Sequence, residues 1–264
     1  MSTCEQTRLP AKSAGPCTGE SLGTSSRWLA SKYAVENAIC SARAQVIVNA
    51  LATMSTVPSC NALMRSGDVN AAVGILSKAA AKTDPDHLAL NLFVGFLVFP
   101  AILDKQLTAA MHNGSAPSDP PEKLLFFGGK QTLALYEHDS AGARAAADSV
   151  IRLAPLVLKG AFIDADFMWP IAYAYVIRGD SARGLREMRR IVASVPVSRD
   201  EIRGATSLIA LGYTAALAGN VDEAIDAFTK AVSVPSYTSR AMLRVDPILA
   251  PLRKDPRFQK LVKE

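Results

Sequence analysis

Apolar residues recur with the period of an α-helix near the C-terminal end of the chain. Those between residues 219 and 235 are spaced at i, i+3, i+4, i+7, i+10 and i+11, and they are Val221, Ala224, Ile225, Phe228, Ala231 and Val232. This spacing places them in one stripe along a helix, with polar residues on the other side. The pattern therefore predicts an amphipathic helix that buries its stripe against a neighbouring element.

Three other segments resemble this one. Residues 138–155 and 179–196 are each 18 residues long and align without a gap at an offset of 41 residues, and both read Asp-Ser-Ala from their second position. Residues 219–235 begin 40 residues after the second copy, and residues 67–85 form a longer fourth copy. A fixed period of this kind indicates a repeat architecture.

Each segment opens with residues suited to a tight turn and closes on a proline. A glycine such as Gly179 can end the preceding helix in a left-handed conformation, and the Asp or Asn that follows can cap the next helix. The closing proline should end that helix, because the residue before a proline is pushed out of helical geometry. The apolar segments 166–178 and 201–218, upstream of the glycines, predict the partner helices. We expect helical hairpins that are stable only when stacked.

Differences in amino-acid composition along the chain predict where its structural parts begin and end. The first residues are rich in Ser, Thr, Gly and Pro and lack the basic and apolar succession of a signal peptide. A Gly-, Pro- and Ser-containing run in the middle of the chain predicts a loop. The expected parts are a disordered tail (1–26), degenerate N-terminal helical repeats (27–112), a linker (113–122), regular repeats (123–240) and cap helices (241–264).

From Leu208 onward the chain resembles a tetratricopeptide repeat. The small and large positions of that motif are matched by Leu208, Leu211, Gly212, Gly219, Ala224, Phe228, Ala231 and Pro235. The preceding unit has Gly184 and Met188 where the motif has Ala and Phe, and the spacing of 40 or 41 residues exceeds the family's usual period of about 34. The resemblance implies an all-α fold, an α-α superhelix of helical hairpins, with longer turns between repeats.

The C-terminal segment 246–262 is similar to the cap of tetratricopeptide arrays in bacterial multidomain regulators, including serine/threonine kinases and nucleotide cyclases. Asp246-Pro247 and Asp255-Pro256 each place a capping acid before a proline at the first helical position, which predicts two short helices in succession. Phe258 and its apolar neighbours would cover the exposed end of the last repeat. The resemblance implies a role in bacterial regulation or signalling.

The resemblance also implies where a partner would bind. In this family the first helix of each pair lines a concave groove, and the corresponding positions here are Trp169, Tyr173, Ile177, Thr206, Ile209, Tyr213 and Leu217, with Tyr136 continuing the row. The implied function is a non-catalytic protein-interaction module with an apolar and aromatic groove. The alternative is that these aromatic side chains form ordinary core between the repeats.

A row of arginines forms a second candidate surface for binding a partner. The formal net charge is +5, and Arg183, Arg186 and Arg190 recur at i, i+3 and i+7 in one predicted helix. They form either a solvated convex face or a face for an acidic partner. Because neighbouring acidic residues dilute the positive field, the pattern does not favour nucleic acid as the partner.

Catalytic and cofactor motifs are not found in the sequence. It has no glycine-rich nucleotide loop and no kinase motif, so we expect no enzyme and no cofactor. Its four cysteines, Cys4, Cys17, Cys40 and Cys60, lack the close spacing of zinc ligands, so we expect no metal and reduced thiols in a cytoplasmic protein.

One uncharged segment raises the question of a membrane. Residues 88–103 carry no charge over 16 residues, which is too short to span a bilayer and predicts a buried helix. A different function is also open here. This helix and the Phe126-Phe127 pair could wall a pocket for a small apolar ligand, which would make the chain a regulatory sensor.

Overall fold

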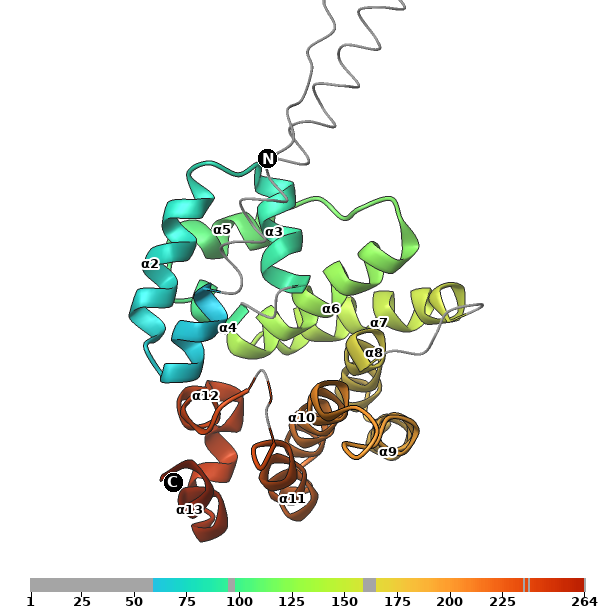
Figure 1. Cartoon of the computed structure of the whole chain (residues 1–264). Helices are drawn as coiled ribbons and strands as arrows, with labels where there is room; N and C mark the ends of the chain where they lie inside the picture. The colour runs from blue at the N-terminus through green and yellow to red at the C-terminus, as the bar shows by residue number, and fades with distance from the viewer. Residues whose placement is uncertain (1–58, 95–97, 159–164, 235, 237, 264) are drawn as a thin grey trace, which may run out of the picture. The chain divides into compact units, whose positions relative to one another are not determined.

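The computed structural model describes residues 59–94, 98–158, 165–234, 236 and 238–263 (Figure 1). The chain divides into a unit of residues 1–47 and a unit of residues 48–264, and all the described residues belong to the second unit. The predicted tail, residues 1–26, and the start of the predicted N-terminal repeats, residues 27–58, lie outside the described residues.

Every regular element among the described residues is a helix, so the predicted all-α class is confirmed. Residues 59–66 are helical. The N-terminal elements that follow are α2 (Val69–Ala80), α3 (Pro85–Val94), α4 (Val98–Ala101) and α5 (Lys105–Asn113). None of the described helices combines the length and the apolar character needed to cross a membrane.

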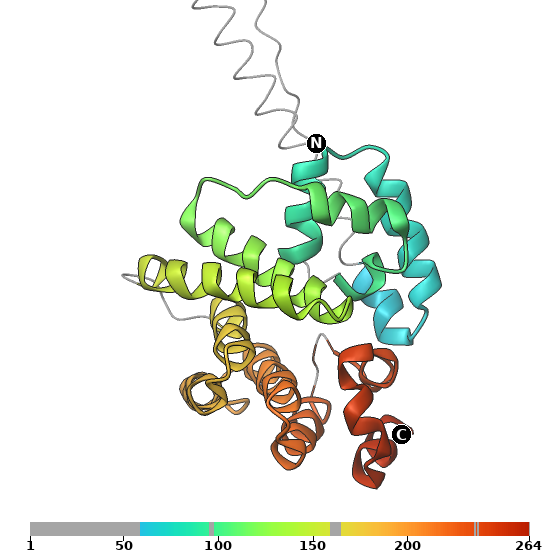
Figure 2. The same ribbon diagram turned by 180° about the vertical axis from the view of Figure 1, so that it is seen from behind.

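The C-terminal elements form consecutive pairs followed by three short helices (Figures 1 and 2). They are α6 (Pro120–Tyr136), α7 (Ser140–Val157), α8 (Ala165–Ile177), α9 (Ser181–Ser194), α10 (Glu201–Leu217), α11 (Val221–Ala231), α12 (Arg240–Val245), the 3-10 helix η1 (Pro247–Lys254) and α13 (Pro256–Lys263). Helix α6 packs on α7, α8 on α9 and α10 on α11, and the first helices α6, α8 and α10 also contact one another in succession. Helices α9 and α11 are thus second helices of neighbouring pairs, and both pack against α10.

The same turn joins two helices in four places. Three of them have the predicted glycine, and His138 takes its place in the fourth. At Gly179 the backbone N–H donates to Val176 O at 2.9 Å, and Asp180 N–H donates to Tyr175 O at 2.8 Å. The Asp180 side chain then accepts from Arg183 N, which caps α9. Equivalent bonds occur after Gly67, His138 and Gly219, and all four residues have positive φ. The turn geometry predicted from the sequence is therefore confirmed.

The prolines at the ends of the repeats do not all act as predicted. Helix α9 ends at Ser194, before Pro196, as expected. Pro155, however, lies inside α7, which continues to Val157, so the prediction that it ends the helix is wrong. Proline removes one backbone donor but its φ suits a helix. The buried side chains of Ala154 and Val157 hold the last turn against the core.

The described part of the uncharged segment 88–103 is helical in α3 and in α4. Helix α3 ends at Val94 and α4 begins at Val98, with the residues between them outside the described part of the chain. Leu92, Phe93 and Phe99 are buried, as the prediction of a core segment requires.

The predicted linker is irregular between α5 and α6, and α6 contributes residues to the core on both sides of it. Residues 114–119 contain no helix. Ser115 N–H donates to the Asp86 carboxylate at 2.8 Å, and α6 packs against α3 and α4. The finer division of the chain into a linker and two helical parts stays a prediction.

Candidate functional site

The first helices of the pairs bring together the aromatic residues that the sequence places in one row. The Trp169 ring of α8 lies 5.5 Å from the Tyr213 ring of α10 and 5.8 Å from the Tyr173 ring, centroid to centroid. Tyr213 in turn meets Phe228 of α11 edge to face at 5.3 Å. The row exists, and it continues into the core between α10 and α11.

The aromatic row is not an open groove. Tyr173, Ile209 and Tyr213 are buried, with exposures of 2%, 4% and 7%. The other predicted groove residues are partly buried, and they are Tyr136, Trp169, Ile177, Thr206 and Leu217. The 3-10 helix η1 packs on α6 and α10, so the chain's own cap covers this part of the first helices. The expectation of an open groove is corrected accordingly, and a role in binding stays a prediction.

A buried carboxylate ties the cap to two first helices. The Tyr213 hydroxyl donates to Asp246 Oδ2 at 2.7 Å, and the Tyr136 hydroxyl lies 3.1 Å from both carboxylate oxygens. Asp246 also caps η1 by accepting from Ile248 N–H at 2.9 Å. The Arg253 guanidinium donates to the Asp246 backbone carbonyl at 3.0 Å. Residues of α6, α10 and η1 thus meet at one acid.

Burial controls protonation in this cluster. Burial raises the pKa of Asp246 above its ordinary value of 3.8, although the hydroxyl, amide and guanidinium groups around it act in the opposite direction. Burial, and then the charge of Asp246, raises the pKa of Tyr136 and of Tyr213. The phenols therefore keep their protons and remain hydrogen-bond donors. The cluster holds the cap in place.

The sequence predicts that Asp246 caps a helix, but it does not predict that Asp246 binds two tyrosines. Its position before Pro247 predicts the helix cap that the structure contains. Its partners Tyr213 and Tyr136 lie 33 and 110 residues away. No spacing or motif in the sequence connects residues so far apart.

The three arginines of α9 lie on its exposed side, opposite the buried Leu185 and Met188. The Arg183 guanidinium stacks over the Tyr175 ring, 4.0 Å from its centroid. Arg186 Nε is 3.9 Å from Glu187 Oε1, which is the outer limit of an ion pair. These arginines, Arg183, Arg186 and Arg190, form a face that we call the arginine face.

A cleft of about 500 Å³ lies beside the arginine face, between α9 and α11. Its floor is apolar and includes Leu208 and Leu211 of α10, Val192 of α9 and Ala227 of α11. Its rim is charged and includes Arg189, Asp222, Glu223, Asp226 and Lys230. The spacing pattern of Arg183, Arg186 and Arg190 does not include Arg189, although Arg189 is adjacent to Arg190 on the same helix.

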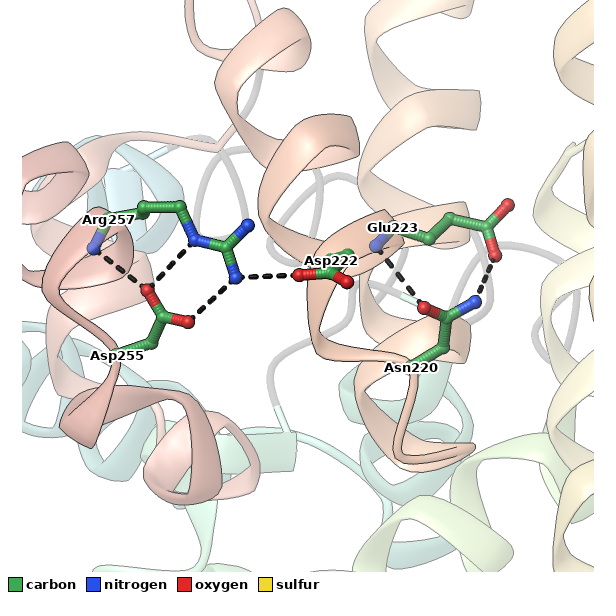
Figure 3. A network of polar contacts seen from close by, with 5 residues as sticks. All are labelled: Asn220, Asp222, Glu223, Asp255 and Arg257. Atoms are coloured by element: carbon green, nitrogen blue, oxygen red, sulfur yellow. Dashed lines mark hydrogen bonds and ion pairs between the residues drawn. The ribbon is translucent and has the colours of Figure 1, made fainter.

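Two ion pairs fix the rim of this cleft. Arg189 spans from α9 to α11 and donates to both Glu223 oxygens at 2.6 and 2.7 Å, and Asn220 donates to the same carboxylate at 2.8 Å. Figure 3 shows Asn220 and Glu223 at the start of α11.

The second pair joins α11 to α13. Arg257 Nη2 lies between Asp222 at 2.7 Å and Asp255 at 2.8 Å (Figure 3). Hydrogen bonds from Arg257 lower the pKa of Asp255 to about 2. Asp255 is therefore ionised at neutral pH, and Arg257 connects α13 to the start of α11 through a solvent-exposed ion pair that contributes little to stability.

The space proposed for a small apolar ligand is occupied by the chain's own side chains. Phe93 and Phe126 meet edge to face with centroids 5.3 Å apart, and Phe127 packs on Phe126 at 5.7 Å. A Cβ atom on Gly129 would lie 2.0 Å from the Phe93 ring, so this ring rests directly on the α6 backbone. These contacts favour a packed core at this place over a ligand pocket.

Among the residues that the structure covers, no three His, Cys, Asp or Glu side chains gather in a way that could hold a metal ion. Cys60 is buried, and burial raises the pKa of its thiol to about 11. Its Sγ donates weakly to the Ala72 carbonyl at 3.7 Å. Cys4, Cys17 and Cys40 lie outside the described residues.

The fold and the surface define an all-α protein of paired helices with a C-terminal cap. Models of known protein families do not match the chain, and a search of curated proteins also finds no match.

Proposed function

We propose that this chain is a non-catalytic module that binds a partner polypeptide, built as a tetratricopeptide-like α-α superhelix. The repeated turn after Gly67, His138, Gly179 and Gly219 supports the proposed stack of hairpins. A repeat of this kind builds an extended rigid surface and leaves its function to the side chains on that surface. The similarity of the cap to those of bacterial regulators extends the proposal to cytoplasmic signalling.

The arginine face carries this proposal. Arg183, Arg186 and Arg190 are exposed on one long helix, and Glu187 is the acid beside them. Guanidinium groups pair with carboxylates in a fixed, bidentate geometry, which suits recognition of an acidic polypeptide. The helix is anchored by its buried Leu185 and Met188, so the charges have a rigid base.

The aromatic row contributes to this function indirectly. Tyr213 and Tyr136 are engaged with Asp246, and a partner could reach their side chains only by displacing η1. The arginine face needs no such rearrangement, and preformed surfaces bind without the cost of reordering. The proposed docking surface is therefore α9 rather than the covered faces of α6, α8 and α10.

Charge reversal tests the proposal. The variant R183E/R186E/R190E should lose an acidic partner that the unchanged chain captures from a cell extract by cross-linking and mass spectrometry. A matched control, K78E/K82E/K105E, makes the same change in net charge at exposed lysines outside α9. Equal recovery of the partner by both variants would show that α9 is not the docking surface.

A further inference from the structure

The cleft between α9 and α11 has walls of opposite charge. On the α9 side, Arg186 and Arg190 are exposed next to Arg189, which lines the cleft. On the α11 side, Asp222 and Asp226 are exposed and line the cleft. Lys230 lies one turn beyond Asp226 and limits the acidic wall to the first two turns of α11.

The internal ion pairs do not cancel this separation of charge. Arg189 and Glu223 satisfy each other across the cleft, which leaves the exposed Arg186 and Arg190 beside its α9 wall, with Arg186 Nε 3.9 Å from Glu187. Asp222 contacts Arg257 but its side chain is 81% exposed, so this carboxylate remains open to a second cation. An exposed carboxylate in a surface ion pair keeps most of its hydration and can be shared.

The floor of the cleft is apolar and largely buried, with Leu208 and Leu211 each 7% exposed and Ala227 3% exposed, so the charged walls carry the match to an occupant. Leu208 and Leu211 lie at its base, with Val192 and Ala227 on either side. An occupant that matches the walls must therefore be basic along one edge and acidic along the other. The surface of α9, α10 and α11 itself has this arrangement.

We propose that the occupant is a second copy of this chain. A two-fold axis that lies in the interface, parallel to the two walls, places the basic α9 wall of each copy on the acidic α11 wall of the other. Arg186 and Arg190 of one protomer then face Asp222 and Asp226 of its partner, twice in each dimer. This inference rests on the proposed function, because it names the partner of the α9 surface.

The nature of the contacts predicts how strong the association is. Exposed charge pairs contribute little individually and are screened by salt, and the apolar floor is narrow. The dimer should therefore be weak and should dissociate as the ionic strength rises. Sedimentation velocity on the full chain should show a concentration-dependent dimer at low salt, and an association constant at least about tenfold lower at high salt.

Two variants test the pairing of walls. R186E/R190E makes both walls acidic, and D222K/D226K makes both walls basic, so each variant alone should remain a monomer at low salt. An equimolar mixture of the two should form a heterodimer, because each basic wall then meets an acidic one. The quadruple variant, which exchanges the signs of both walls, should form a homodimer again. Circular dichroism should show unchanged helix content in all of them.

Three outcomes would overturn the inference. They are a wild-type chain that stays monomeric at low salt, a dimer that both variants retain, and a mixture of monomeric variants that does not associate. These outcomes differ from failure of the proposed function, which is measured as loss of an acidic partner from the α9 variant. A monomeric chain that still captures such a partner would refute the dimer and leave the arginine face as its docking surface.

Discussion

The Tyr213 hydroxyl donates to Asp246 Oδ2 at 2.7 Å, and this bond joins α10 to the residue between α12 and η1 in the cap. Both side chains are buried, with exposures of 7% and 6%. A buried carboxylate costs free energy unless hydrogen bonds replace its lost hydration. The two tyrosines and the η1 backbone supply these bonds, so the position of the cap depends on groups far away in the sequence.

Removing one hydroxyl should therefore destabilise the fold. Tyr213→Phe deletes a hydrogen bond to a buried carboxylate and should lower the free energy of unfolding by about 1.5–3 kcal/mol. Tyr136→Phe should cost less, because its hydroxyl lies 3.1 Å from each oxygen. Urea denaturation followed by circular dichroism measures both values.

The control for these variants is Tyr175→Phe. Tyr175 is partly exposed and its ring supports Arg183, which phenylalanine preserves. Its free energy of unfolding should stay within about 0.5 kcal/mol of the original value. If all three variants lost the same amount, the bonds to Asp246 would not be the cause.

The raised pKa of Asp246 predicts how stability depends on pH. Because burial favours the protonated acid in the folded chain, the folded pKa lies above that of the unfolded chain. The contribution of this group is fully present below the unfolded pKa, near 3.8, and is lost as pH rises through the folded pKa. The free energy of unfolding should therefore contain a component from Asp246 that increases as the pH falls toward this range.

The Asp246→Asn variant isolates this component, since it cannot ionise and all other groups are unchanged. The difference in unfolding free energy, original minus variant, should become more positive as the pH falls from neutral. A difference that is flat across this range, or that falls with decreasing pH, would show that the folded and unfolded pKa values of Asp246 do not differ in the stated direction.

The sequence predicts the local parts of this fold well. The Gly179-Asp180 pair determines its turn because one residue supplies the left-handed conformation and the next supplies the cap, and neither depends on distant contacts. The apolar stripe of α11 likewise becomes a buried face, with Phe228 at its centre. The exposure of Arg186 follows from the same helical period.

The candidate site could be predicted only in part, because its exposure depends on tertiary contacts. The row of Trp169 and Tyr213 follows from the resemblance to tetratricopeptide repeats, but neither the resemblance nor residue spacing shows that η1 folds back over it. The partnership of Tyr213 with Asp246 depends on that return of the chain. The cleft between α9 and α11 exists because these two helices pack on α10 at a distance from each other. No sequence pattern predicts this distance.

Close packing at Gly129 predicts a large effect of one methyl group. A Cβ at this position would lie 2.0 Å from the Phe93 ring, which is buried where α3 packs on α6. Gly129→Ala should therefore lower the free energy of unfolding by about 1–3 kcal/mol through overpacking. Urea denaturation measures the change.

Gly74→Ala is the matched comparison. Gly74 is exposed on α2, and a methyl group added there would have nothing within 4 Å, so alanine meets no obstacle. The gain in helix propensity should raise the free energy of unfolding by about 0.5–1 kcal/mol. A Gly129→Ala chain that is stabilised as much as Gly74→Ala would contradict the packing described for Phe93.

The turn before α7 offers a stabilising substitution. His138 adopts φ of 58°, whereas the other three equivalent turns have glycine at this position. The left-handed conformation costs a residue with a side chain about 1–2 kcal/mol. Replacing His138 by glycine removes this cost, but the greater freedom of glycine in the unfolded chain offsets part of the gain. His138→Gly should therefore raise the free energy of unfolding by roughly 0.5–1 kcal/mol.

Gly179→Ala makes the reverse change in the next repeat. A Cβ at Gly179 meets no atom within 4 Å, so any loss of stability there comes from the backbone conformation alone. It should lower the free energy of unfolding by about 1 kcal/mol. Because the hydrogen bonds of the two turns share no residue, the double variant should lie close to the sum of the single effects. A destabilised His138→Gly chain would mean that the His138 side chain makes a contribution larger than the strain of its backbone.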